Sequence, residues 1–380
     1  MKSPICTMLD IEFPLLGFSH CRDVVAAVTN AGGMGIFGAV NLPPDRLEEE
    51  LAWIDAHVDG KPYGVDLIVP NRFEGKGTAI DPERLLGAVP DTHKDFASEV
   101  LGRYGIDASS IESGRSEFLQ FAENLTEEGA MASLKVAFKH PIKLIANALG
   151  IPPDYMLSMA REHGVAVAAL VGTKEHAIKQ VEAGVDILVV AGGEAGGHCG
   201  EVSTMVLVPE VHEAIQPYGN VPILAAGGIT TGRQMAAAMA MGASGAWCGS
   251  VWLTTAEAET SPVVKEKMLA AASRDTVRSK SRTGKPSRQL RSPWTEAWDQ
   301  EGPAPLPMPL QALVSEPALQ KIRDLSGGGH EGAMALDTYW VGQGVGLMNQ
   351  AMSTGAVVQC FKEDFAAAYE RLSNFLEMEG

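Results

Sequence analysis

Short runs of apolar residues alternate along the chain with longer amphipathic stretches that have the spacing of helices. The apolar runs lie at residues 12–18, 35–40, 63–69, 134–140, 164–170, 185–190, 221–228 and 243–250. This alternation is typical of a parallel sheet whose strands are joined by helical crossovers. Eight such strands predict an α/β fold of the (β/α)₈ TIM-barrel type. An open doubly wound sheet is the alternative, and it would need a reversal of strand order.

The helical stretches are most regular in the second half of the chain. Residues 173–184, 208–219 and 233–242 each give about three turns and end at glycine, a favoured helix stop. Earlier in the chain, Pro44 suits a first helical turn and acidic residues follow it. The C-terminal stretch 363–380 is expected to be a helix that packs back on the barrel.

Two stretches do not follow the barrel rhythm. The first, within about 71–130, is charged and contains glycine, and it follows the third strand, where barrels carry functional insertions. The second, 254–330, has a proline-rich middle that should be extended and poorly helical. We therefore expect a barrel made of 1–253 and 331–380, with 254–330 as a lid-like or smaller segment that covers the substrate. Trp294 and Trp298, four residues apart, should pack this lid rather than bind a ligand.

Composition narrows the function classes. The chain has 380 residues, 46% of them hydrophobic and 20% charged, and a formal net charge of -17. That charge argues against nucleic acid or an anionic membrane as a partner. No stretch reaches the roughly 20 continuous apolar residues of a membrane span, and Asp10 and Glu12 interrupt any apolar signal region. Five scattered cysteines without CxxC spacing suit reduced thiols in a cytoplasmic protein and give no metal site.

One histidine stands out in the block VVAGGEAGGHCG, residues 189–200. His198 follows the sixth strand, so it should face the mouth of the barrel, where the active sites of this fold lie. Small residues surround it, whereas a structural core histidine would be walled by larger apolar side chains. An imidazole with an ordinary pKa of about 6.5 can take or give a proton near neutral pH. His198 is therefore the catalytic candidate, and neighbouring Cys199 is expected to be a small filler.

The loops after strands seven and eight are also rich in small residues. Gly227 and Gly228 precede a helix, and Gly249 and Ser250 follow the last strand. Barrels commonly hold phosphate groups at these two positions, on backbone N–H groups and a helix N-terminus. The sequence thus predicts a phosphate site, and the alternative is that both loops are only tight turns.

Other residues are weaker candidates for a catalytic or binding role. His163, His176 and His212 fall in helical patterns and are expected at the surface, and Glu194 is expected to cap the turn or form a salt bridge. The glycines of GGMGIFGA (32–39) open a strand rather than a helix, so the context of a dinucleotide loop is missing.

These residues resemble the nitronate monooxygenase family, formerly called 2-nitropropane dioxygenases. The resemblance rests on GGEAGGHCG (192–200), AAGGI (225–229) and GASGAWCGS (242–250), and extends to AAVTNAGGMGIFGA (26–39), TGKPSRQLRSPWTEAW (283–298) and VGQGVGL (341–347). It covers most of the chain apart from about 75–130. It implies a (β/α)₈ enzyme with FMN as its cofactor.

The resemblance also implies roles for residues. His198 matches the family's catalytic base, Asn71 matches a flavin contact, Gly192 lies in the turn beside the flavin ring, and Gln343 matches a segment that closes over the cofactor. The full expected cofactor-binding set is Gly17, Phe18, Asn71, Gly192, Gly193, Gly197, Ala226, Gly227, Gly228, Gly249, Ser250 and Gln343. The chain departs from the family at Gly17 and Phe18, near where a Pro-Met pair is usual, and at Ala191, where glutamine is common.

The activity implied is the FMN-dependent oxidation of alkyl nitronates by dioxygen to a carbonyl compound and nitrite. A sister group, the FMN-dependent enoyl-acyl-carrier-protein reductases, shares the histidine block and implies the alternative of an NAD(P)H-dependent reductase. A third reading is a barrel that binds flavin or another phosphate ligand without catalysis. The partners expected are a small-molecule substrate and dioxygen, and a homodimer stays an open option.

Overall fold

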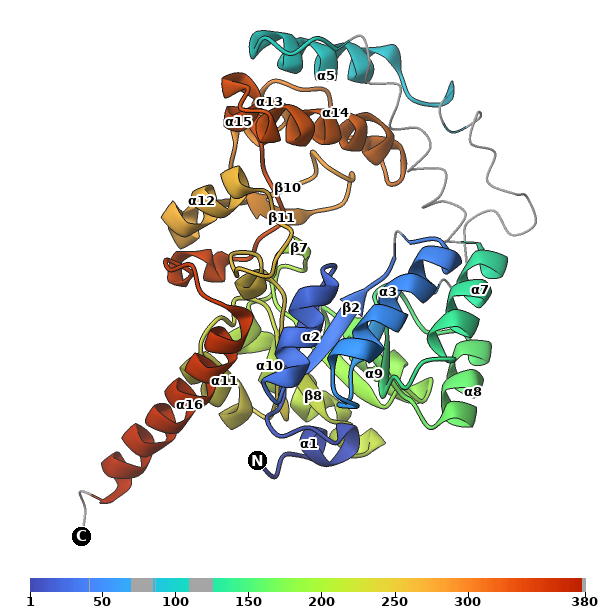
Figure 1. Cartoon of the computed structure of the whole chain (residues 1–380), viewed down its shortest axis with the longest axis vertical. Helices are drawn as coiled ribbons and strands as arrows, with labels where there is room; N and C mark the ends of the chain where they lie inside the picture. The colour runs from blue at the N-terminus through green and yellow to red at the C-terminus, as the bar shows by residue number, and fades with distance from the viewer. Residues whose placement is uncertain (41, 70–84, 86, 109–125, 378–380) are drawn as a thin grey trace.

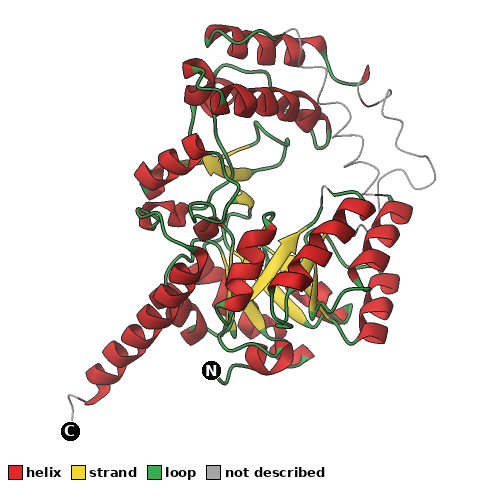
Figure 2. Ribbon diagram, viewed as in Figure 1, coloured by secondary structure: helices red, strands yellow, loops and turns green. Residues whose placement is uncertain are grey.

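The protein is described here by a computed structural model that places residues 1–40, 42–69, 85, 87–108 and 126–377. Eight parallel strands form a closed barrel, and helices surround it (Figures 1 and 2). The strands, in their order around the barrel, are β1(Leu15–Ser19), β2(Met34–Gly38), β3(Gly64–Leu67), β4(Leu144–Asn147), β5(Ala166–Val171), β6(Ile187–Ala191), β8(Ile223–Ala226) and β9(Gly245–Cys248). The pairing of β9 with β1 closes the ring, so the expected (β/α)₈ barrel is confirmed and the open sheet is excluded.

The strands alternate between two apolar layers because successive side chains point to opposite faces. One layer fills the barrel interior, and helix α1(Pro4–Leu9) adds Ile5 and Leu9 to it from below. The other layer lies between the strands and the surrounding helices, which are α2(Arg22–Asn30), α3(Pro44–His57), α7(Glu127–Ala137), α8(Asp154–His163), α9(Lys174–Glu182), α10(Thr204–Ile215) and α11(Gly232–Ala240).

The position of the fourth strand was predicted wrongly. Residues 134–140 belong to the end of α7 and the turn after it, and the strand is β4, residues 144–147. The Thr126 side chain caps α7 by accepting the N–H of Gly129, and Lys135 is exposed on the outer face of the helix. A short apolar run does not distinguish a strand from the buried side of a helix, and β4 is only four residues long.

A second group of elements lies above the barrel in Figure 1. A three-stranded sheet joins β10(Thr276–Ser279), β11(Ser287–Leu290) and the short β7(Gly197–His198). Around it lie α12(Pro262–Ala270), α13(Pro293–Gln300), α14(Leu310–Gly327) and α15(Glu331–Leu336), and α5(Asp91–Arg103) packs on α14 at the top of Figure 1. Trp294 and Trp298 are buried among α5, α14 and α15, as expected of packing residues.

The proline-rich stretch is only partly extended. Residues 303–307 form neither helix nor strand, as expected, but helices stand on both sides of them. Pro293 occupies the first turn of α13, where a missing N–H costs nothing. Pro317 lies inside α14, beyond the proline-rich middle to which the expectation applied.

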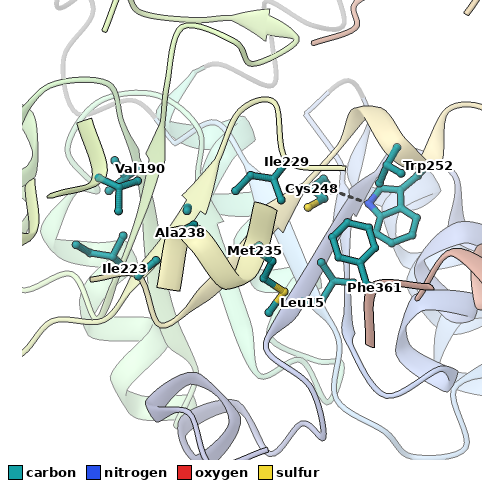
Figure 3. Packing of buried hydrophobic residues seen from close by; sticks show 14 of the residues in the cluster. Leu15, Val190, Ile223, Ile229, Met235, Ala238, Cys248, Trp252 and Phe361 are labelled. Carbon is teal, nitrogen blue, oxygen red and sulfur yellow. Dashed lines mark hydrogen bonds between the residues drawn. The ribbon is translucent and has the colours of Figure 1, made fainter. Parts of the chain in front are cut away.

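The C-terminal helix, α16(Thr354–Glu377), packs on the barrel through its first half. The stretch expected to pack back, 363–380, does so only at its start, where the Phe365 ring meets the edge of Phe13, so this expectation was wrong for the rest of the described stretch. Phe361 stacks near Trp252, whose indole N–H donates to the Cys248 carbonyl (2.6 Å), and Met235 of α11 lies beside them (Figure 3). This packing supports the ends of β8 and β9 from behind. The second half of α16 leads away from the barrel (Figure 1) and exposes Tyr369, Leu372 and Phe375.

Within the described residues, every helix is too short or too polar to cross a membrane.

The contact between α11 and α16 allows a test of this packing with one substitution. A Cβ at Gly232 would overlap the Phe361 carbonyl, whereas a Cβ at Gly355, near the start of α16, would meet no atom within 4 Å. We expect Gly232→Ala to lower the free energy of unfolding by about 1–3 kcal/mol through overpacking. Gly355→Ala should leave it unchanged or raise it by up to about 1 kcal/mol. Urea denaturation measures both, and equal effects would contradict the close approach.

Candidate active site

A cavity of about 480 Å³ opens at the carboxyl ends of the barrel strands. Its floor is formed by the ends of β1, β3, β6, β8 and β9, and its walls by 258–264 and 337–344. The volume is in the range of small-molecule and cofactor pockets. Eight of the predicted site residues line it together: Phe18, Gly197, His198, Ala226, Gly227, Gly228, Gly249 and Ser250.

The other predicted residues lie elsewhere. Gly17 is packed against Val28 and Trp252 behind the first strand, and Gly192 is packed against Thr204. The Gly193 carbonyl accepts two hydrogen bonds from the Arg288 guanidinium, at 3.0 and 2.9 Å. These three are not among the cavity-lining residues.

Gln343 begins η5(Gln343–Leu347), between the cavity-lining Gly342 and Gly344. Its backbone N–H donates to the Glu194 carbonyl (2.9 Å). Asn71 lies outside the described residues.

Three glycine-containing loops converge on one side of the cavity. Gly227 and Gly228 both adopt positive φ, 97° and 73°, a conformation that side chains rarely tolerate. Across from them, Gly342 donates its N–H to Ser250 Oγ (2.8 Å), and a Cβ at Gly344 would collide with Thr230. Helix α11 begins directly behind the 227–228 turn with a capping box of Thr231 and Gln234. Backbone, a hydroxyl and a helix N-terminus therefore meet where the sequence predicted a phosphate site.

The turn that carries His198 is held by a carboxylate. Glu194 Oε2 accepts hydrogen bonds from the backbone N–H and the hydroxyl of Thr204, at 2.9 and 3.0 Å. Glu194 thus caps the turn at the start of α10, one of the two roles expected of it.

His198 is positioned by a strand pair that the sequence analysis did not foresee. β7 pairs antiparallel with β11, and this pairing places His198 opposite Ser287. The imidazole Nε2 lies 2.8 Å from Thr283 Oγ1, and the Thr283 hydroxyl is within hydrogen-bond distance of the Lys285 carbonyl (3.3 Å). When that hydroxyl donates to the carbonyl, Nε2 carries the imidazole proton and Nδ1 is the acceptor nitrogen.

The surroundings of His198 favour its neutral form. His198 is exposed to the cavity, yet partial desolvation by the surrounding chain lowers the pKa of its imidazole below the ordinary value of 6.5, and the positive charges of Lys285 and Arg282 lower it further. At neutral pH the ring is therefore a base that has not yet taken a proton.

An aromatic wall stands beside this histidine. The centroid of the Trp340 ring lies 6.2 Å from that of His198, and the Arg282 guanidinium is stacked over Trp340 at 3.8 Å. Glu316 binds Arg282 through two hydrogen bonds, at 2.6 and 3.1 Å. The stack and the ion pair hold the indole in place at the edge of the cavity.

The sequence analysis did not single out the cavity-lining residues His20 and Asp66. His20, after β1, shares a hydrogen bond between Nδ1 and the Gly38 carbonyl (2.7 Å), and burial lowers the pKa of its ring. Asp66, in β3, is buried and its Oδ1 has no hydrogen-bond partner among the described residues. The available signal was an aspartate inside the apolar run 63–69.

One group of side chains in the described part of the chain has metal-ligand geometry. Oxygen and sulfur atoms of Cys21, Asp23 and Glu259 lie within 4.8 Å of one another at the cavity rim. Both carboxylates are exposed, and burial raises the pKa of the Cys21 thiol, which disfavours the thiolate that a metal needs. These three side chains therefore resemble a solvent-exposed acidic cluster at the rim of the cavity more than a metal site.

Comparison with known proteins agrees with this architecture. The family model for nitronate monooxygenase matches residues 6–364. The Mycobacterium tuberculosis protein Rv1533, provisionally named a monooxygenase, is 50% identical over 99% of this chain and 100% of its own length. A Bacillus subtilis protein named "Probable nitronate monooxygenase" is 27% identical over 96% of this chain and 98% of its own length.

Two solved structures share the fold. Nitroalkane oxidase from Streptomyces ansochromogenes superposes with a TM-score of 0.78 at 24% identity, covering 97% of this chain and 99% of that one. A FabK variant from Thermotoga maritima gives 0.70 at 26% identity, covering 99% and 100%.

The electrostatic origin of the His198 shift can be measured without any substrate. We expect the imidazole C–H resonance of His198 to titrate by NMR with a midpoint below 6.5, with its assignment taken from the signal lost in His198→Asn. Lys285→Met removes one nearby positive charge and should raise that midpoint by a few tenths of a unit. Lys143→Met, at the opposite end of the barrel, is the control. Equal midpoints in the wild type and Lys285→Met would exclude this charge as a cause.

Proposed function

The chain belongs to the nitronate monooxygenase family, and on this basis we propose that it binds FMN and oxidises alkyl nitronates with dioxygen to a carbonyl compound and nitrite. The observation that carries the proposal is the placement of a neutral His198 in the same cavity as the glycine loops at the ends of β8 and β9. A base and a phosphate cradle in one cavity suit a phosphorylated cofactor with a substrate beside it.

The residues present fit FMN. Backbone N–H groups of Gly227, Gly228 and Gly249, the Ser250 hydroxyl and the start of α11 would hold the phosphate. The small residues Gly197 and Ala226 leave the cavity wide enough for a flat ring system. When bound, the flavin supplies one-electron chemistry between the substrate and dioxygen, which protein side chains do not offer.

The part of His198 is proton transfer and orientation. As a neutral base it would take the proton from the carbon next to the nitro group of a nitroalkane, or hydrogen-bond the oxygens of a nitronate. The Thr283 hydroxyl fixes the ring through Nε2 (2.8 Å), so the other nitrogen keeps a constant direction. Lys285 and Arg282 add positive potential that favours an anionic substrate over a neutral one.

The wall above the barrel would keep bulk water away from the substrate. Trp340 and Tyr339 line the cavity, and Trp340 is held by its stack on Arg282. Because charge interactions are stronger where water is excluded, this wall increases the effect of each polar group that faces the substrate.

The test is anaerobic mixing of the FMN-loaded protein with an alkyl nitronate and, separately, with NADPH, followed by flavin absorbance. We expect bleaching by the nitronate, with nitrite released when air is admitted. Bleaching by NADPH together with indifference to nitronate would contradict the proposal and support the reductase activity of the sister group. A protein that cannot be loaded with FMN would contradict both.

Substitution of the histidine separates catalysis from binding. We expect His198→Asn to reduce kcat/KM with a neutral nitroalkane by about 10²–10⁴-fold, the usual contribution of a general base. The loss should be smaller with the preformed nitronate, which needs no deprotonation. FMN affinity, measured by fluorescence quenching, should stay within about twofold, because the phosphate loops are untouched. Equal losses with both substrates would assign His198 to orientation rather than to proton abstraction.

A further inference from the structure

The hairpin of β10 and β11 is strongly basic, in contrast to the rest of the chain. Residues 274–291 contain seven lysines and arginines and one acidic residue, whereas the whole chain carries a formal net charge of -17. The hairpin lies above the barrel, next to the short strand β7 that carries His198 (Figure 1). Positive charge gathered at this place in an acidic protein indicates a role toward an anion.

Three arginines of the hairpin hold it in place. They bind acceptors on other segments: Arg278 binds Glu201 (3.2 Å), Arg282 binds Glu316 (2.6 Å), and Arg288 binds the Gly193 carbonyl (2.9 Å). Because an ion pair has no net charge, Arg278 and Arg282 contribute little to the electrostatic potential at a distance.

Lys280 and Lys285, in the turn of the hairpin, keep their charges unpaired. Both side chains are exposed, and among the residues that the structure describes no carboxylate lies within ion-pair distance of either ammonium group. Ser279 pairs with Ser287 and Ser287 with His198, so the turn begins one residue beyond a row that crosses the small sheet to the histidine. With strands about 4.8 Å apart, this row spans about 10 Å, which is comparable to the Debye length in dilute salt. After desolvation, the charge of Lys285 is the largest cause of the lowered pKa of the His198 imidazole, so its field reaches the cavity.

The side of the cavity mouth next to β1 is acidic. Glu259 lines the cavity, and its carboxylate lies within 4.8 Å of that of Asp23 and of the Cys21 thiol. Both carboxylates are exposed. Cys21 follows β1, whereas β7 follows β6, and these two barrel strands are three places apart in the order β6-β8-β9-β1. The glycine loops at the ends of β8 and β9 therefore lie between a basic side and an acidic side of the mouth.

This arrangement distinguishes the two forms of the proposed substrate. A nitronate is an anion, and the nitroalkane from which it forms has nearly the same size and no charge. The chain as a whole repels an anion, so an anion that approaches the cavity is favoured only on the side of the hairpin. A neutral molecule experiences neither effect.

We propose that Lys280 and Lys285 attract the nitronate to the mouth of the cavity and make the protein selective for the anion over the neutral nitroalkane before either one is bound. This inference rests on the proposed function and adds an entry route to it. Lys285, the nearer of the two lysines to His198, has the larger effect.

The experiment compares kcat/KM for an alkyl nitronate and its neutral nitroalkane at saturating FMN while the salt concentration is raised from about 10 mM to about 500 mM. At about pH 8, where His198 is neutral in every variant, we expect kcat/KM for the nitronate to fall by about three- to tenfold. The fall should be in KM, because neither lysine touches the reacting atoms. The value for the neutral nitroalkane should stay constant.

Single substitutions identify the charges responsible. At low salt, Lys285→Gln should lower kcat/KM for the nitronate by about threefold and flatten its salt dependence, with a smaller effect of Lys280→Gln. Glu259→Gln should act in the opposite direction, because it removes a repelling charge. Lys143→Gln, an exposed lysine at the other end of the barrel, changes the net charge equally and is the matched control. A readout without turnover is the NMR titration of His198, whose midpoint should rise with salt in the wild type and less in Lys285→Gln.

Two outcomes would overturn the inference. If nitronate and nitroalkane show the same salt dependence, or if Lys143→Gln loses as much activity as Lys285→Gln, the hairpin does not attract the substrate, and the proposed function stands. If the FMN-loaded wild type does not oxidise nitronates at any salt concentration, the proposed function fails and this inference fails with it.

Discussion

The closed parallel barrel is the constraint on which the rest of this structure depends. Pairing of β9 with β1 forces the carboxyl ends of all eight strands onto one rim. Residues far apart in the sequence, such as Phe18, His198 and Ser250, therefore line one cavity. Helix α11 secures this rim from outside, because it packs against the strands that carry the glycine loops, and α16 packs in turn on α11 and α2. Closure of the barrel thus brings the residues of the site together, and each loop contributes the side chains or backbone groups that follow its own strand.

The second group of elements adds what the barrel lacks. A strand that ends at the rim cannot by itself orient a histidine in the loop after it, and here β11 pairs with β7 to do so. Residues 282–285 of the loop between β10 and β11 then bring Thr283 to the imidazole and the charges of Arg282 and Lys285 near it. The same Arg282 supports Trp340. One short hairpin therefore sets the position, the tautomer and the protonation of the histidine, as well as the wall beside it.

The barrel and several of the residues that line its cavity could be predicted from the sequence. The strand at 185–190, for example, is a short apolar run between two regular helical patterns, and a run in this context is readily assigned to a buried strand. Residues 134–140 were misassigned because the buried side of α7 carries as many apolar residues as a strand. Gly192 was expected beside the flavin ring; the structure shows it packed against Thr204, and the flavin contact stays a prediction. Sequence shows that a glycine is needed without showing whether a ligand or the chain itself approaches it. The pairing of β7 with β11 joins segments about 90 residues apart, so local patterns could not reveal it.

Desolvation changes the pKa values of His198 and Asp66 in opposite directions, and both changes favour the uncharged form of the side chain. It lowers the pKa of the imidazole and raises that of the carboxyl, and both groups become neutral. The strand ends that form the floor of the cavity therefore carry no charged group, whereas Glu259, Arg323 and Asp337 line other parts of it. The chain as a whole carries a formal net charge of -17. The ligands proposed for this cavity, a cofactor phosphate and a nitronate, would bring their own negative charge. That charge meets backbone N–H groups, the N-terminus of α11 and the positive side chains of Arg282 and Lys285, with no carboxylate at the floor to repel it. Burial of Asp66 in its neutral form thus removes one carboxylate charge from the cavity of an acidic protein.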